Sequence, residues 1–119
     1  MKDFRTLNVW EKGHRLTLAV YKATTKFPRD ELYGLTNQLR RSCVSVPANI
    51  AEGCGRGSDA DLARCLQIAA GSASELEYHI LLANELGLFE EADRKHLTEE
   101  VTEVKRMLAS FMEKLRAEC

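Results

Sequence analysis

Two pairs of a carboxylate and a histidine, each spaced three residues apart, are the strongest candidates for metal chemistry in this sequence. Glu11 and His14 form one pair, and Asp93 and His96 form the other. Di-iron bundles hold their metals with two Glu-x-x-His motifs and two further inward-facing carboxylates. Here the second pair starts with aspartate, and the pairs begin the first and last of four predicted helices, at opposite ends of an alternating bundle. We therefore expect no metal site and no cofactor.

The glycines of segment 53–57 are a candidate for phosphate binding, but they lack the required context. Gly53, Gly55 and Gly57 follow no predicted strand, and no Gly-Lys-Ser/Thr comes after them, so neither a Rossmann nor a Walker A signature is present. No serine or cysteine stands in a recognisable nucleophile motif. His79 is predicted to be a packed or surface histidine. The sequence thus predicts a protein that is not an enzyme and has no identifiable small-molecule substrate.

The cysteines contain no Cys-x-x-Cys pair; they are Cys43, Cys54, Cys65 and Cys119. We expect reduced thiols, as is usual in the cytosol, with Cys43 and Cys65 acting as small core residues. The sequence has no apolar run of about 18 residues and no signal-like N-terminus. The expected location is the cytoplasm, without a membrane partner.

Length and composition predict one globular domain covering residues 1–119. The chain has 119 residues, of which 45% are hydrophobic, 29% are charged and only two are proline, which is typical of a globular chain with long elements. Apolar residues recur at three- and four-residue spacing over about 8–26, 30–52, 58–86 and 91–117. The predicted fold class is all-α, an antiparallel up-down-up-down four-helix bundle.

Prolines, glycines and a serine set the predicted helix boundaries. Pro28 ends the first helix, because the residue before a proline is pushed out of the α region. Gly53 is expected to cap the second helix, and Pro47 to kink or break it. Ser58 is the expected N-cap of the third helix, which stops at Gly87.

The spacing also assigns an inner face to each helix. The four predicted faces are Trp10, Gly13, Thr17, Val20 and Thr24; Leu32, Leu35, Leu39, Cys43, Val46 and Ile50; Leu62, Leu66, Ala69, Ala73, Leu76, Ile80 and Ala83; and Leu97, Val101, Val104, Leu108, Phe111 and Leu115. The third helix carries further apolar residues outside its face: Ile68, Ala70, Leu81, Leu82 and Leu86. It is apolar over more than the usual arc of about 100°, so it should be covered on several sides.

Polar residues follow one flank of the second helix, beside its apolar face. They are Gln38, Arg41, Ser42, Ser45, Asn49 and Glu52. This flank is either solvated surface or a buried network that fixes helix register or lines a subunit contact. If it is buried, Arg41 could pair with Glu52 or Glu75. Ser72, in the small-residue segment 69–74, belongs to the same hypothesis, since that segment should pack closely against a neighbouring helix or, alternatively, a ligand or RNA.

The charges are distributed unevenly along the chain, although the net charge is only −1. Residues 1–58 carry ten Lys and Arg against five Asp and Glu, whereas residues 59–119 carry seven against thirteen. Three interpretations stay open: complementary hairpins within one chain, head-to-tail packing of subunits, or a basic face for RNA. The candidate RNA contacts are Lys12, Arg15, Lys22, Lys26, Arg29, Arg40 and Arg41.

Several segments together resemble a known family. Segment 27–35 reads Phe-Pro-Arg-Asp-Glu-Leu-Tyr-Gly-Leu, and segment 45–53 reads Ser-Val-Pro-Ala-Asn-Ile-Ala-Glu-Gly, with Gln-Leu-Arg-Arg at 38–41 between them. With Leu-Asn-Val-Trp at 7–10, and with Ala-Gly-Ser at 70–72 followed by Glu75 and Glu77, these segments are similar to the bacterial four-helix-bundle proteins encoded in 23S rRNA intervening sequences.

The resemblance implies an antiparallel four-helix bundle that assembles as a homopentamer of undetermined role. A related branch, the accessory variability protein of diversity-generating retroelements, is a basic pentamer that works with RNA and a reverse transcriptase; this mildly acidic chain departs from it. We therefore expect a non-enzymatic, homo-oligomeric protein that serves as a scaffold or binds a partner. The alternative is an accessory protein that contacts structured RNA through the basic residues of its first two helices.

Overall fold

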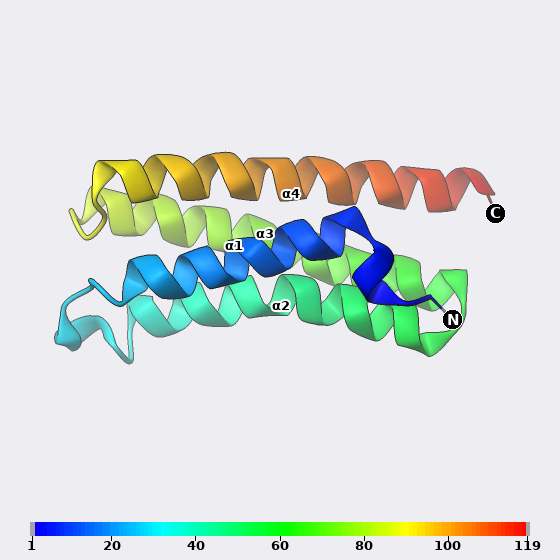
Figure 1. The fold of residues 1–119 in the computed structure, drawn as a ribbon, viewed down its shortest axis with the longest axis horizontal. Helices are drawn as coiled ribbons and strands as arrows, with labels where there is room; N and C mark the ends of the chain where they lie inside the picture. The colour runs from blue at the N-terminus through cyan, green and yellow to red at the C-terminus, as the bar shows by residue number, and fades with distance from the viewer. Residues whose placement is uncertain (1, 119) are drawn as a thin grey trace.

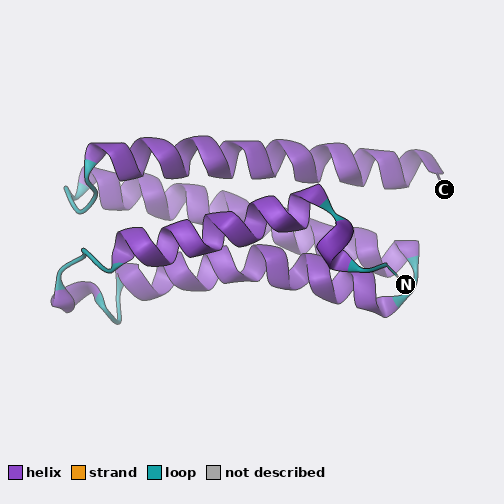
Figure 2. Cartoon of the chain, viewed as in Figure 1, coloured by secondary structure: helices purple, strands orange, loops and turns teal. Residues whose placement is uncertain are grey.

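The computed structural model describes residues 2–118, and all of its regular structure is helical (Figure 2). Four long helices run over α1 (Asn8–Thr24), α2 (Leu35–Arg56), α3 (Asp59–Glu85) and α4 (Glu91–Glu118). Two single-turn 3-10 helices, η1 (Phe4–Thr6) and η2 (Arg29–Glu31), precede α1 and α2. No strand occurs among these residues, so the prediction of an all-α chain with four helices is confirmed.

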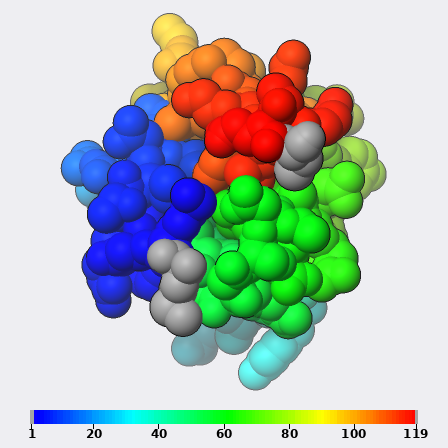
Figure 3. Space-filling model, turned by 90° about the vertical axis from the view of Figure 1, so that its right-hand side faces the viewer, coloured from blue at the N-terminus to red at the C-terminus, as the bar shows by residue number. Residues whose placement is uncertain are grey.

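The helices pack side by side into an elongated body of 46 × 22 × 20 Å. Each helix packs against the next one along the chain and α4 also packs against α1, whereas the backbones of α1 and α3 do not approach one another closely. The connections alternate between the two ends of the body (Figure 1), as an antiparallel up-down-up-down bundle requires. Seen from one end, α1 and α4 lie beside one another (Figure 3). None of the described helices combines the length and apolar character needed to cross a membrane.

The start of α2 differs from the prediction. The helix begins at Leu35 rather than near residue 30, because Gly34 has φ −108° and ψ −112°, outside the helical region. The preceding residues instead form η2 and a turn, and the Glu31 side chain accepts a hydrogen bond of 3.1 Å from the Leu35 N–H. Leu32 is consequently 45% exposed and does not belong to the inner face. The shorter α1 ends at Thr24, two residues before the predicted end, and a turn leads to Pro28.

The end of α2 also differs, because Gly53 is a helical residue and not a cap. The helix continues to Arg56, and Gly57 takes the left-handed capping conformation with φ 89°. Gly53 is needed for close packing: a Cβ at this position would lie 2.9 Å from Cys65 Cβ and 3.2 Å from Leu62 Cα. Steric contact with α3 selects this glycine, so the predicted 53–57 connection shrinks to Gly57 and Ser58.

Pro47 lies inside α2 without interrupting it, so of the predicted kink or break the break does not occur. Proline has no N–H, which leaves the carbonyl of Cys43, four residues earlier, without its helical donor. The hydroxyl of Thr17 on α1 lies 3.1 Å from this carbonyl and 2.8 Å from the carbonyl of Gly13. The single hydroxyl proton of Thr17 is thus shared between a carbonyl of its own helix and the carbonyl that Pro47 leaves without a donor.

The predicted inner faces of α2, α3 and α4 form the core. Apart from Leu32 and the half-buried Phe111, every residue assigned to these three faces is buried. On α1 the predicted Gly13, Val20 and Thr24 are buried, whereas Trp10 and Thr17 are only half-buried. Val9, Leu16 and Ala23, which the prediction left out, are buried as well. Cys43 and Cys65 are buried with free thiols, as is Cys54, whereas Cys119 lies outside the described residues.

Candidate functional site

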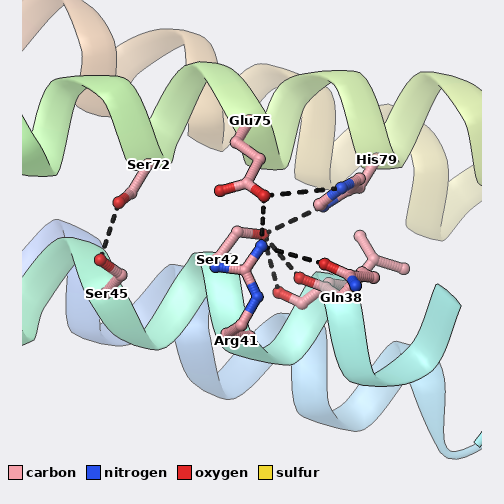
Figure 4. Close-up of polar contacts among 8 residues, drawn as sticks. Gln38, Arg41, Ser42, Ser45, Ser72, Glu75 and His79 are labelled. Carbon is pink, nitrogen blue, oxygen red and sulfur yellow. Dashed lines mark hydrogen bonds and ion pairs between the residues drawn. The ribbon is translucent and has the colours of Figure 1, made fainter. Parts of the chain in front are cut away.

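A row of polar side chains joins α2 to α3, and we call it the α2–α3 seam (Figure 4). It consists of Gln38, Arg41, Ser42, Ser45 and Asn49 on α2, and Ser72, Glu75 and His79 on α3. The α2 members lie at three- and four-residue spacing beside the buried face of their helix, and those on α3 do the same. The antiparallel arrangement of the two helices brings the two rows together.

The exposed part of the seam is an ion pair between Arg41 and Glu75. The guanidinium of Arg41 also donates to Gln38 Oε1 at 3.0 Å. Both charged side chains keep substantial contact with solvent, 51% for Arg41 and 39% for Glu75. Of the two partners considered for Arg41, the structure selects Glu75, and Glu52 pairs with Arg56 in the next turn of its own helix. Glu52 is therefore not part of the seam.

The buried part of the seam contains Ser42 and His79. Ser42 is fully buried, and its Oγ donates to the carbonyl of Gln38 at 2.9 Å and lies 3.3 Å from His79 Nδ1. The other ring nitrogen of His79 lies 3.9 Å from Glu75. Desolvation lowers the pKa of His79; Glu75 acts in the opposite direction, and Arg41 adds to the lowering.

Hydroxyl and amide groups continue the seam toward the loop between α2 and α3. Ser45 and Ser72 share a hydrogen bond of 2.7 Å between their hydroxyl oxygens. Asn49 Nδ2 donates to the Ser45 hydroxyl at 3.0 Å and to its carbonyl at 2.8 Å. Of the seven predicted network residues, six therefore lie in the seam, and Glu52 does not. His79 was missed, although its spacing of four from Glu75 and seven from Ser72 places it on the same flank.

The serine, histidine and glutamate of the seam resemble a hydrolase triad in type, but the burial of Ser42 gives them another role. A nucleophile has to reach its substrate, and Ser42 has no exposed surface. The carboxylate of Glu75 is directed at Arg41 rather than held by the histidine alone. What this arrangement can do is fix the register of α2 against α3, because a shift along the helix would leave several polar groups without partners.

The predicted basic residues do not form one free cationic surface. Lys12 pairs with Glu100 at 3.0 Å, Arg15 with Glu11 at 3.2 Å, and Lys26 with Glu90 at 2.7 Å and Asp93 at 3.1 Å. The hydrogen bonds that Lys26 donates to Glu90 and Asp93 raise the pKa of Lys26.

Arg40 is held inside its own chain as well. It donates to Thr24 Oγ1 at 3.0 Å and stacks 4.7 Å above the centre of the Tyr21 ring. Within residues 2–118, only Lys22 and Arg29 of the proposed RNA contacts are exposed and form neither an ion pair nor a side-chain hydrogen bond. The ion pairs of Lys12, Lys26 and Arg41 link the basic half of the chain to the acidic half, which agrees with complementary hairpins within one chain.

Large apolar side chains remain exposed on three of the four helices and on the turn after η2. Those at least 40% exposed are Leu18, Tyr21, Leu32, Tyr33, Val44, Ile68, Tyr78, Leu81 and Leu86. Within the described residues, none of them is on α4. Tyr78 and Leu81 line a groove of about 460 Å³ between α3 and α4, with Ile80, Val101 and Arg94 among its other lining residues. The groove and the exposed apolar residues of α1 lie on separate faces, because α1 and α3 are diagonal to one another.

Comparison with known proteins shows where the same architecture occurs. A solved structure from Bacteroides thetaiotaomicron, described as a protein with unknown function from the S23 ribosomal protein family, matches with a TM-score of 0.78 and 25% sequence identity. The match covers 87% of this chain and 97% of that chain. No curated protein matches significantly. The family model of the 23S rRNA-intervening sequence protein matches residues 5–110. The chain therefore belongs to the 23S rRNA-intervening sequence protein family.

Proposed function

We propose that this protein is a non-enzymatic, antiparallel four-helix bundle that works as a homo-oligomer, a pentamer by resemblance to its family, and serves as a scaffold or binds a partner. The exposed apolar side chains of α1, α2 and α3 carry this proposal. A single chain leaves Leu18, Tyr78, Leu81 and Leu86 more than half exposed. Tyr78 and Leu81 line the same groove, and exposed apolar side chains that gather in this way mark an interaction site.

The separation of the apolar faces favours a head-to-tail contact between copies. A contact that uses one patch against a different patch closes into a ring when the rotation allows it, whereas a two-fold contact uses the same patch twice. Here α1 and α3 are diagonal, so their exposed residues cannot belong to one patch. The excess of basic residues in the first half of the chain and of acidic residues in the second half suits such a contact.

The test is the mass of the protein in solution. Light scattering coupled to size exclusion should give a multiple of the 13.4 kDa chain mass, five-fold for a pentamer. Dilution over two orders of magnitude should leave the species intact if the contact is specific. A species of one chain mass at every concentration would contradict the proposal.

Binding of structured RNA is the competing proposal, and the ion pairs weigh against it. Most of the candidate contacts form ion pairs with carboxylates of the same chain. Lys22 and Arg29 are the exposed candidates that have no ion pair among the described residues. Binding through phosphates would require a steep loss of affinity with salt. A shift of 23S rRNA fragments at 50 mM salt that disappears near 200 mM would favour RNA over the scaffold role.

A further inference from the structure

The exposed residues of α1 form a ridge, which we define as Leu18, Tyr21 and Lys22. The side chain of Leu18 is 58% exposed and that of Tyr21 is 41% exposed, and Arg40 stacks on the Tyr21 ring. Lys22 follows directly and has no ion pair among residues 2–118. The ridge is thus an apolar knob with a free cation beside it. Apart from this contact with Arg40, the ridge has no partner within its own bundle, because α1 packs against α2 and α4 through its other sides.

The groove between α3 and α4 has complementary features. Gly71, Ser74, Tyr78, Leu81 and Glu85 recur at three- and four-residue spacing on the outer side of α3, so small residues are followed by large apolar ones and then by a carboxylate. A Cβ at Gly71 would meet nothing within 4 Å, so packing inside the chain does not explain this glycine. It costs about 1 kcal/mol of helix propensity relative to alanine.

Two polar groups, one in the groove wall and one near the groove, also have atoms or charges without a partner in the described residues. Glu85 is exposed and forms no ion pair within the described residues. Arg94, in the groove wall, pairs with Glu91 through a terminal nitrogen, but its buried Nε has no hydrogen-bond partner in this part of the chain. Buried donors are normally satisfied in a complete structure. The isolated chain therefore leaves polar atoms without partners on this side of the bundle.

The ridge and the groove lie at the same height along the bundle. Thr17, next to Leu18, contacts the carbonyl of Cys43 on α2, and the adjacent Ser42 contacts His79 on α3. Leu18 is therefore level with the turn of α3 that contains Tyr78. Since α1 and α3 both run toward the same end of the body (Figure 1), the basic end of the ridge and the acidic end of the groove also coincide.

We propose that the ridge of one copy docks into the α3–α4 groove of the next copy, with the long axes of the two bundles parallel. A rotation about an axis parallel to the bundles keeps heights unchanged, so Leu18 and Tyr21 meet the outer side of α3 from Ser74 to Leu81. The same rotation brings Lys22 and Arg29 toward Glu85. Gly71 allows the two backbones to approach closely. This pairing rests on the proposed self-association and names its two surfaces.

Two single substitutions that damage opposite sides of the contact test the pairing. Leu18→Glu places a charge on the ridge and leaves the groove intact. Leu81→Glu places a charge in the groove and leaves the ridge intact. Each variant alone should have the mass of one chain. An equimolar mixture should form a species of two chains, because the intact ridge of one variant can enter the intact groove of the other and the assembly cannot continue. Both positions are exposed, so circular dichroism and thermal unfolding should match the wild type.

A matched control and the wild type separate failure of the pairing from failure of self-association. Ile68→Glu changes a residue of α3 that is 51% exposed but lies on the side of α2, and it should keep the wild-type mass. A wild-type monomer would overturn the proposed function and this pairing with it. A wild-type oligomer that survives Leu18→Glu or Leu81→Glu, that dissociates with Ile68→Glu, or whose two variants fail to combine, would overturn the pairing alone.

Discussion

At the scale of single residues, two groups are held in unusual surroundings by contacts from another helix. The carbonyl of Cys43 depends on the Thr17 hydroxyl, because Pro47 cannot donate to it. The ring of His79 is nearly buried between Ser42 and the Arg41–Glu75 ion pair. In both cases the sequence shows the unusual residue, Pro47 or His79, but it does not show the contact from another helix that stabilises it. Each contact has a consequence that can be measured.

Removing the Thr17 hydroxyl should destabilise the fold through the carbonyl that Pro47 leaves free. Thr17→Val keeps the shape and is expected to lower the free energy of unfolding by about 1–3 kcal/mol, the usual cost of a buried polar group without a partner. In a Pro47→Ala background the alanine N–H can donate to the Cys43 carbonyl, so the cost should fall to less than half. Urea unfolding of the four proteins of this double-mutant cycle measures the coupling. Equal costs in both backgrounds would show that the hydroxyl does not serve this carbonyl.

The lowered pKa of His79 should make the protein less stable as the pH falls. The unfolded chain has the ordinary histidine pKa of 6.5 and the folded chain a lower one, so the unfolded state binds the proton more readily. The contribution of His79 to stability is complete above pH 6.5, is lost as the pH falls, and changes no further below the folded-state pKa.

Denaturant unfolding between pH 8 and pH 5 tests this expectation. His79→Gln should flatten the fall in stability over that range, because it removes the titrating ring. His96→Gln, which removes an exposed histidine from α4, is the matched control and should keep the wild-type slope. If His79→Gln keeps the wild-type slope as well, the loss of stability at low pH has another source.

At the scale of helices, the close approach of α2 and α3 determines where α2 ends. Glycine often ends a helix, and Gly53, Gly55 and Gly57 offered three places to stop. The helix ends at the last of them, Gly57. Gly53 lies against Cys65 and Leu62, so a glycine is needed there for close packing and not for its backbone conformation. Sequence spacing cannot distinguish these two uses of glycine, since both leave the same residue in the same position.

Two alanine substitutions in the last turns of α2 should therefore act in opposite directions. Gly53→Ala would place a Cβ 2.9 Å from Cys65 Cβ, and is expected to cost about 1–3 kcal/mol by forcing the helices apart. Gly55→Ala meets nothing within 4 Å, and should stabilise the helix by up to about 1 kcal/mol. Thermal and urea unfolding report both. A stabilising Gly53→Ala would mean that α2 and α3 lie farther apart than the structure places them.

At the scale of the whole molecule, the charge asymmetry serves first to hold the bundle together. Lys12, Lys26 and Arg41 from the basic half all pair with carboxylates of the acidic half. Exposed pairs of this kind contribute little stability individually, but they help to select which helices lie side by side. The charges that remain, among them Lys22, Arg29 and Glu85, are the ones available for a second copy.

The sequence by itself determined the helical class, the number of helices and the inner faces of α2, α3 and α4. These follow from the spacing of apolar residues, which reflects burial directly. It also placed most of the seam, because polar residues beside an apolar stripe must face a neighbouring helix or water. The family resemblance rested on residues such as Pro47 and Gly53, whose types were visible although their contacts were not.

Only the tertiary structure decided the matters that depend on two helices at once. It assigned Arg41 to Glu75 instead of Glu52 and brought His79 into the seam. It also paired Lys12, Lys26 and Arg41 of the predicted basic patch with carboxylates from a distant part of the chain. It also carried α2 through Pro47 and Gly53. The physical reason is the same in each case: the free energy of a polar group or a glycine depends on what lies opposite, and sequence periodicity describes one helix at a time.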